Sequence, residues 1–159
     1  MALEKSQVVE ALQKVLREAL EAVERMAAMA RDETTSGETR AEGKYDTRAT
    51  EASYLARGQA WRIAELRKLS SWFETLAVDQ PFDPLTVRSG ALVELLGDHP
   101  EFVFMAPIGG TKAVVDGLTV RVISPASPMG SAMTDLEPGD AFEVETPRGM
   151  LSFEILSIC

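Results

Sequence analysis

The stretch DETTSGETRAEGKYDTRATEASY, Asp32 to Tyr54, decides how the rest of this chain is interpreted. It is polar and rich in threonine and acidic residues, and it contains two glycines, Gly37 and Gly43. On each side lies a long segment in which apolar residues recur every three or four positions, which is the spacing of an amphipathic helix. We therefore predict that residues 32–54 form the tip of an antiparallel helical hairpin and that this tip carries the function.

The two flanking segments have apolar stripes that could pack against each other. The first stripe covers residues 3–30 without an internal glycine or proline, and the second covers residues 56–76. Ala56 and Ala60 are small, so we expect the helices to approach closely near the tip. The same periodicity also fits a coiled-coil spacer or dimerisation arm, and that alternative stays open.

The chain changes character after the second stripe. Pro81 and Pro84 end the helix, because proline cannot continue the helical hydrogen bonds. The stretch SPASPMGSAMTDL, residues 124–136, predicts one short helix with Ser127 as its N-cap and Pro128 at its first position. Six short β-like runs bounded by turn residues lie around it, at residues 91–96, 101–105, 112–115, 118–123, 141–146 and 151–158.

The predicted fold class is therefore α+β. An antiparallel coiled-coil hairpin occupies residues 1–79, with its acidic tip near 32–54. A small antiparallel β domain with one short helix occupies residues 80–159. With 159 residues in all, each part can bury only a modest core.

Charge is divided unevenly between the two parts. Residues 1–79 carry 12 Lys and Arg against 14 Asp and Glu, and residues 80–159 carry 4 against 11, which gives net charges of −2 and −7. An acidic second half argues against binding duplex nucleic acid through that half, and suits a basic protein surface instead. The single cysteine, Cys159, excludes an internal disulfide and a cysteine-based zinc site. No membrane-spanning apolar run or signal-peptide pattern is present, so we expect a cytoplasmic protein without membrane contact.

Acidic residues recur in the tip. Glu38, Glu42 and Asp46 are spaced four apart and would share one face if the second helix began near Thr35. Like charges at that spacing weaken an isolated helix, which favours a functional reason for them. The alternative is capping: Thr35 with Glu38 fits a capping box, and Asp46 fits an N-cap. Asp46 and Glu42 are our first candidates for tip chemistry, followed by Glu51.

Several turn and strand residues of the C-terminal part fall in a characteristic order, namely Ser127-Pro128-Met129, Gly139-Asp140, Val144-Glu145, Thr146-Pro147, Gly149 and Glu154-Ile155. In these residues the chain resembles the end of the Gre (GreA/GreB) transcript-cleavage factors. The run from Glu51 to Tyr54 is similar to the stretch that follows the tip in that family. The family places an Asp and a Glu three apart ahead of that tyrosine, where this chain has Thr47 and Thr50.

The resemblance implies an FKBP-like β domain and a role on bacterial RNA polymerase. A Gre factor inserts its hairpin into the secondary channel and stimulates the polymerase's own cleavage of backtracked RNA. It does so as an accessory protein without an activity of its own. Asp46 and Glu42 would then act on a Mg²⁺ ion shared with the polymerase, with no metal bound to the factor alone. Glu51 would assist them.

The resemblance also suggests roles for other residues. Ser127, Pro128 and Met129 would contact the polymerase, or Met129 would lie in the core behind a helix cap. Four tip residues could contact RNA or the polymerase, or could offset the charge of the tip, namely Arg40, Lys44, Tyr45 and Arg48. We expect a monomer.

Three other interpretations remain open. A Gre-like regulator could occupy the channel and modulate or inhibit the polymerase without stimulating cleavage. A peptidyl-prolyl isomerase is disfavoured, because its aromatic-lined pocket is hard to build from four phenylalanines. A homodimeric coiled-coil adaptor would be recognised by its sedimentation. Trp61 and Trp72 are expected to pack within the hairpin or between the domains.

Overall fold

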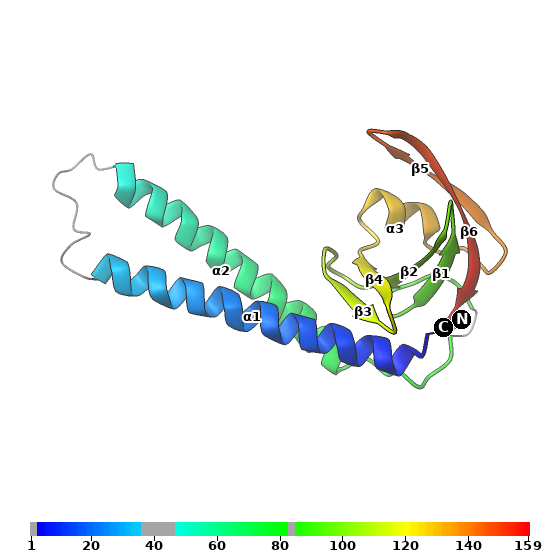
Figure 1. Cartoon of the computed structure of the whole chain (residues 1–159), viewed down its shortest axis with the longest axis horizontal. Helices are drawn as coiled ribbons and strands as arrows, with labels where there is room; N and C mark the ends of the chain where they lie inside the picture. Colours follow the sequence, from blue (N-terminus) through cyan, green and yellow to red (C-terminus); the bar gives the residue numbers. More distant parts are fainter. Residues whose placement is uncertain (1–2, 36–46, 83–84) are drawn as a thin grey trace. The chain divides into compact units, whose positions relative to one another are not determined.

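The computed structural model describes residues 3–35, 47–82 and 85–159 (Figure 1). The chain divides into two compact units. One comprises Met1–Val15 together with Trp72–Cys159, and the other comprises Leu16–Ser71. The predicted domain boundary at residue 79 stays a prediction, because the compact units divide the chain within the helices.

The unit Leu16–Ser71 is formed by parts of two long helices, α1 (Lys5–Thr35) and α2 (Thr47–Glu74). The two helical segments run antiparallel (Figure 1). Leu16, Leu66 and Leu69 are buried in this unit. Arg67 donates a hydrogen bond to Glu24 across the two segments at 2.7 Å. The expected pair of antiparallel helices is therefore present.

Burial of the apolar stripes decreases toward the far end of these helices, where Ala27 is still buried. Met26 is 60% exposed and Leu55 is 67% exposed, and Ala56 and Ala60 are exposed as well. The prediction that the two alanines let the helices approach closely is wrong. Alanine side chains bury too little apolar area to hold two helices together, and the larger apolar side chains here point to solvent.

The sheet has six strands in the order β3-β4-β2-β1-β6-β5. Most neighbours are antiparallel, as predicted, but β2 and β4 are parallel. This exception arises because β3 forms a hairpin with β4 at the edge of the sheet, so β4 returns in the direction of β2. The strands are β1 (Leu92–Leu96), β2 (Pro100–Met105), β3 (Lys112–Val115), β4 (Leu118–Ile123), β5 (Ala141–Thr146) and β6 (Gly149–Ile158).

The predicted turns occur where the sequence placed them. Asp116 and Gly117 both have positive φ, 51° and 78°, as a two-residue hairpin turn requires between β3 and β4. The short helix α3 (Pro128–Met133) lies between β4 and β5, also as predicted. Local turn chemistry therefore determines most of the strand boundaries.

The core of the sheet unit lies between the sheet and α3. Leu95, Met105, Met133 and Ile155 are fully buried in it. The rings of Phe142 and Phe153 stack at 5.5 Å between centroids and extend this core toward β5. The core thus fixes α3 against the β5 end of the sheet, where the candidate site lies.

The helix ends that belong to this unit have an aromatic cluster of their own. Phe73 is fully buried, and its ring lies 5.3 Å from Phe104 and 5.0 Å from Trp72. The side-chain amide of Gln13 donates to the Phe73 carbonyl at 3.2 Å. Trp72 therefore packs as expected.

Two cations lie over one aromatic ring close to the C-terminal strand. The Lys5 ammonium lies 4.3 Å from the centroid of the Phe82 ring, and the Arg88 guanidinium lies 4.4 Å from it. Burial lowers the pKa of Lys5, and Arg88 adds to this effect, while Cys159 opposes it. Burial raises the pKa of the Cys159 thiol.

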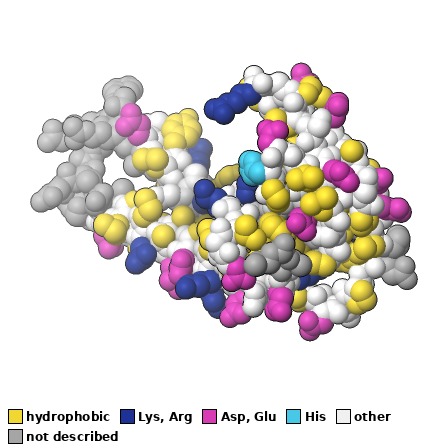
Figure 2. Space-filling model, turned by 45° about the vertical axis from the view of Figure 1, so that its right-hand side comes forward, with side chains coloured by type: hydrophobic (Ala, Val, Ile, Leu, Met, Phe, Trp, Pro, Cys, Tyr) yellow, Lys and Arg dark blue, Asp and Glu magenta, His cyan; other side chains and the backbone are white. Residues whose placement is uncertain are grey.

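None of the helices in the described parts of the chain is long and apolar enough to cross a membrane. Figure 2 shows acidic side chains spread over the surface of the sheet unit, in keeping with the net charge of its sequence.

Candidate docking groove

The start of α3 is a tightly held helix cap. Ser127 has extended backbone angles, φ −72° and ψ 156°, and its side-chain oxygen accepts from the Gly130 amide at 3.0 Å. The same hydroxyl donates to the Ser124 carbonyl at 2.7 Å. Pro128 follows at the first helical position, where its missing amide costs nothing. The prediction of Ser127 as N-cap is confirmed.

Gly130 allows the helix to lie directly against the preceding turn. A Cβ at this position would lie 1.9 Å from the Ser124 carbonyl oxygen, far inside contact distance. The Thr134 hydroxyl donates to the Gly130 carbonyl at 2.6 Å and closes the other end of the helix. Only glycine fits here, and the close approach fixes where Pro128 emerges.

The predicted contact residues of α3 differ in exposure. Pro128 is exposed, whereas Met129 is partly buried and packs against the core. Arg121 reaches the Met129 sulfur at 3.9 Å and forms a 2.7 Å ion pair with Glu101. Pro128 is therefore the side chain of this helix start that a partner could touch most directly.

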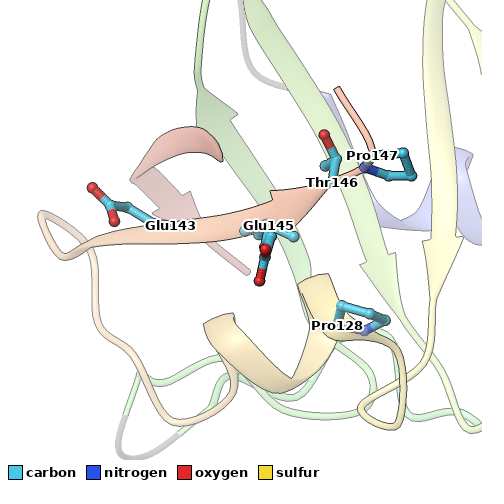
Figure 3. Close-up of a pocket in the computed structure, with 6 residues that line it drawn as sticks. Pro128, Glu143, Glu145, Thr146 and Pro147 are labelled. Atoms are coloured by element: carbon cyan, nitrogen blue, oxygen red, sulfur yellow. The ribbon is translucent and has the colours of Figure 1, made fainter. Parts of the chain in front are cut away.

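An open groove of about 500 Å³ separates α3 from the outer strand of the sheet (Figure 3). In the figure, the carboxylate of Glu145 lies on the side of β5 that faces Pro128, and Glu143 lies further along the strand. The groove is lined by Pro128, Glu143, Val144, Glu145, Thr146 and Pro147.

The turn at one end of the groove is held by its own hydrogen bonds. The Thr146 hydroxyl donates to the Gly149 carbonyl at 2.8 Å and accepts from the Arg148 amide at 3.3 Å. This turn joins β5 to β6, so the groove wall is a β-hairpin with fixed register. The backbone of this wall is already ordered, so binding would have to order only the side chains.

Apolar and acidic groups share this wall. Val144 lines the groove, and its cross-strand partner Leu151 is 45% exposed. Glu143 and Glu145 are exposed, and neither forms an ion pair with any residue that the structure describes. Of the apolar residues that line the groove, Val144 is largely buried in the core and Pro128 is exposed, so the groove offers an exposed proline and two carboxylates without an ion-pair partner among the described residues.

Most of the predicted tip residues lie outside the described residues. This applies to Glu38, Arg40, Glu42, Lys44, Tyr45 and Asp46, and to the side chain of Arg48. Glu51 is exposed on α2. The suggestion that the second helix begins near Thr35 is wrong, because Thr35 ends α1 and α2 begins at Thr47.

The described residues contain no cluster of metal ligands, and the tryptophan in the middle of α2 is exposed. Within the described ranges, no group of three or more His, Cys, Asp or Glu side chains could hold a metal ion. Trp61 is 66% exposed, so the expectation that it packs within the hairpin is wrong.

Sequence reasoning missed the two glutamates of the groove. Strand β5 alternates between exposed and buried residues, with Glu143 and Glu145 on the exposed side and Phe142 and Val144 on the buried side. That alternation was visible in the sequence and placed both acids on one face of the strand. The position of Glu145 on the side of Pro128 depends on how α3 packs, which the strand pattern does not contain (Figure 3).

Part of the sheet unit is similar in sequence to known proteins. A family model described as "Transcription elongation factor, GreA/GreB, C-term" matches residues 113–159, a segment that includes the groove. Transcription elongation factor GreA of Rhodospirillum rubrum is 32% identical over 97 residues, which are 61% of this chain and 60% of that protein. The match thus spans less than two thirds of that relative.

Two solved structures are similar over longer segments at lower identity. Gfh1 of Thermus aquaticus covers 94% of this chain and 94% of its own, with 20% identity and a TM-score of 0.39. The elongation factor GreA/GreB of Nitrosomonas europaea covers 58% of this chain and 78% of its own, with 21% identity and a TM-score of 0.37. Both TM-scores are below 0.5, so these two likenesses carry no further conclusion.

Proposed function

We propose that the chain is a transcription elongation factor of the GreA/GreB kind, which binds bacterial RNA polymerase at the secondary channel and stimulates the cleavage of backtracked RNA; the sequence matches to this family support the proposal. The observation that carries this proposal is the groove beside Pro128, which lies inside the segment matched by the family model. It is a preformed surface with both apolar and charged groups, as protein docking sites require.

Cleavage would depend on the tip. Carboxylate oxygens are the protein ligands that Mg²⁺ prefers, and Asp46, Glu42 and Glu51 supply them at or next to the tip. The ion itself would belong to the polymerase, where it activates a water for attack on the RNA phosphate. In this proposal the chain contributes one or two carboxylates and no catalysis of its own.

A second candidate function keeps the docking without the cleavage. Thr47 and Thr50 stand where active members of the family have an Asp and a Glu, and hydroxyls are poor substitutes for carboxylates on Mg²⁺. The chain would then occupy the channel and regulate or inhibit the polymerase. This candidate rests on those two threonines.

The two functions are separated by a cleavage assay on a stalled, backtracked elongation complex with 3′-labelled RNA and Mg²⁺. If cleavage is stimulated, short 3′ fragments appear with the wild-type chain and decrease with Asp46→Asn or Glu42→Gln. Glu21→Gln is the matched control, because it neutralises an exposed acid of α1 away from the tip.

Two other outcomes would exclude one or both of these functions. Displacement of a known secondary-channel ligand without any fragments would refute cleavage and establish the regulator. Failure of the wild-type chain to bind the polymerase at all would overturn both functions.

A further inference from the structure

One side of α2 presents exposed aromatic and cationic side chains in a regular row. Tyr54 is 67% exposed and Trp61 is 66% exposed. Arg57, Ala64 and Lys68 are exposed as well. These five positions are three or four residues apart, so they form one stripe along the helix, which we call the aromatic stripe. The chain itself thus leaves a surface with two large rings open to solvent.

The charges at the aromatic stripe are poorly matched within the chain. The Arg57 guanidinium lies 5.9 Å from the centroid of the Tyr54 ring, and it forms no ion pair with any described residue. Lys68 forms none with the described residues either. Glu65 lies at the edge of the stripe, and its carboxylate is 3.8 Å from Arg62, a long contact for an ion pair. Two cations and one weakly paired acid therefore share one side of the helix.

We propose that the aromatic stripe binds the aromatic stripe of a second copy of this chain, with the two α2 helices antiparallel about a twofold axis at Trp61. In such an interface every contact between two different residues occurs twice. With Trp61 on the axis, Arg57 lies opposite Glu65 of the second copy, and Tyr54 lies opposite Lys68. Each cation then meets a carboxylate or an aromatic ring. The inference goes beyond the proposed function, because it requires no polymerase.

Small residues beside Trp61 allow the two helices to approach in this arrangement. Gly58 lies opposite Ala64 of the second copy. A Cβ at Gly58 would meet nothing within 4 Å, so the space over this glycine is open. The helix axes can therefore come within the usual packing distance of about 8–10 Å.

The area of the interface predicts a weak dimer. Two copies each of Tyr54 and Trp61 can bury up to roughly 1,000 Å². Specific, stable interfaces bury about 1,200 Å² or more. We therefore expect a dissociation constant on the order of 10–100 μM. At lower concentrations the chain should be a monomer, as the sequence predicts.

Nucleic acid fits the aromatic stripe less well. Unpaired bases could stack on the two rings, but their phosphates require clustered Lys and Arg. Residues 1–79 carry 14 Asp and Glu against 12 Lys and Arg, and Glu65 lies beside the stripe itself. A second copy is the occupant whose charges match both Arg57 and Glu65.

The test is sedimentation velocity of the full chain at concentrations from about 1 to 300 μM. Trp61→Ala should weaken dimerisation by about tenfold or more. Leu55→Ala is the matched control and should dimerise like wild type, because Leu55 is also 67% exposed on α2 but lies outside the stripe. Circular dichroism checks that each variant keeps its helices.

A charge exchange tests the antiparallel register. Arg57→Glu and Glu65→Arg should each weaken dimerisation, because like charges then face each other across the twofold axis. An equimolar mixture of these two chains should restore it, because the facing charges are opposite again. A mixture that stays monomeric would show that Arg57 and Glu65 do not face each other.

Three further outcomes would overturn the proposal. The first is a wild-type chain that stays monomeric over the whole range. The second is a dimer that Trp61→Ala does not weaken, which would place the interface elsewhere. The third concerns a Trp72→Phe chain, in which Trp61 is the only tryptophan and its emission should shift to shorter wavelength as the chain is concentrated. A shift caused instead by single-stranded RNA at low protein concentration would identify nucleic acid as the occupant.

Discussion

Adding one methyl group should have opposite effects at two glycines, Gly130 and Gly58. At Gly130 the new Cβ would lie 1.9 Å from the Ser124 carbonyl oxygen and 2.7 Å from its carbon, and both atoms belong to backbone that cannot rotate away. At Gly58, inside α2, a Cβ would meet nothing within 4 Å. The two sites therefore separate steric cost from helix propensity.

The magnitudes follow from these contacts. Gly58→Ala should raise the free energy of unfolding by about 1 kcal/mol, because alanine is the better helix former. Gly130→Ala requires α3 and the Ser124 turn to separate by roughly 1.5 Å to reach ordinary contact, which should cost about 3 kcal/mol or more. The movement would also break the 3.0 Å hydrogen bond by which Ser127 caps the helix.

Urea unfolding followed by circular dichroism measures both effects in one series. We expect the midpoint to increase for Gly58→Ala and to decrease strongly for Gly130→Ala. Gly130→Ala should also bind the polymerase more weakly, because Pro128 moves with the cap. A Gly130→Ala chain as stable as wild type would refute the close approach of α3 to the turn, and with it the geometry of the groove.

Three further predictions concern the core, the tryptophans and pH. Phe104→Ala should lower the free energy of unfolding by about 3–5 kcal/mol in urea titrations, because its fully buried ring contacts two other aromatic rings. Acrylamide should quench the fluorescence of a Trp72→Phe chain, which keeps exposed Trp61, more strongly than that of a Trp61→Phe chain. The pH prediction uses a Cys159→Ser background. The free energy of unfolding should rise as pH increases from the lowered pKa of Lys5 toward the ordinary lysine value, because the unfolded chain binds more protons than the folded chain in that window. Lys5→Met should remove this rise.

Each of these three predictions would be contradicted by a specific result. A cost below about 1 kcal/mol for Phe104→Ala would show that the aromatic cluster is not packed as described. Equal quenching of the two single-tryptophan chains would contradict the exposure of Trp61. Identical pH profiles with and without Lys5 would mean that its amine is not buried.

Much of the sheet unit could be predicted from local sequence, because its turns are specified by individual residues. Asp116-Gly117 fixes a hairpin, and Ser127 with Pro128 fixes a helix start. The β2–β4 pairing could not be predicted in the same way. Strand order depends on which strands meet across the core, and the alternation of side chains along each strand is the same for parallel and antiparallel neighbours.

For the helices, the sequence predicted the elements but not how deeply their residues are buried. Apolar spacing predicted two long helices, and both are present, but it did not predict where burial ends. Periodicity gives the face of a residue and not the distance to its neighbour, so Trp61 and Ala60 were both expected to be covered. The groove also depends on packing, since Pro128 and Glu145 are close only because α3 lies against β5.

The path of β6 has a consequence for how the protein is made. Its ten residues pair with β5 along one half and with β1 along the other, and it lies between these two strands. Strand β1 leaves the ribosome well before β6 and can pair at that stage only with β2. The sheet can therefore close only late in synthesis, after β6 has emerged, and until then Leu95 and the apolar residues beside it lack half of their cover. A nascent chain stalled before β6 should be a good substrate for chaperones and proteases, whereas the hairpin helices, whose contacts come earlier in the sequence, do not have to wait for this strand.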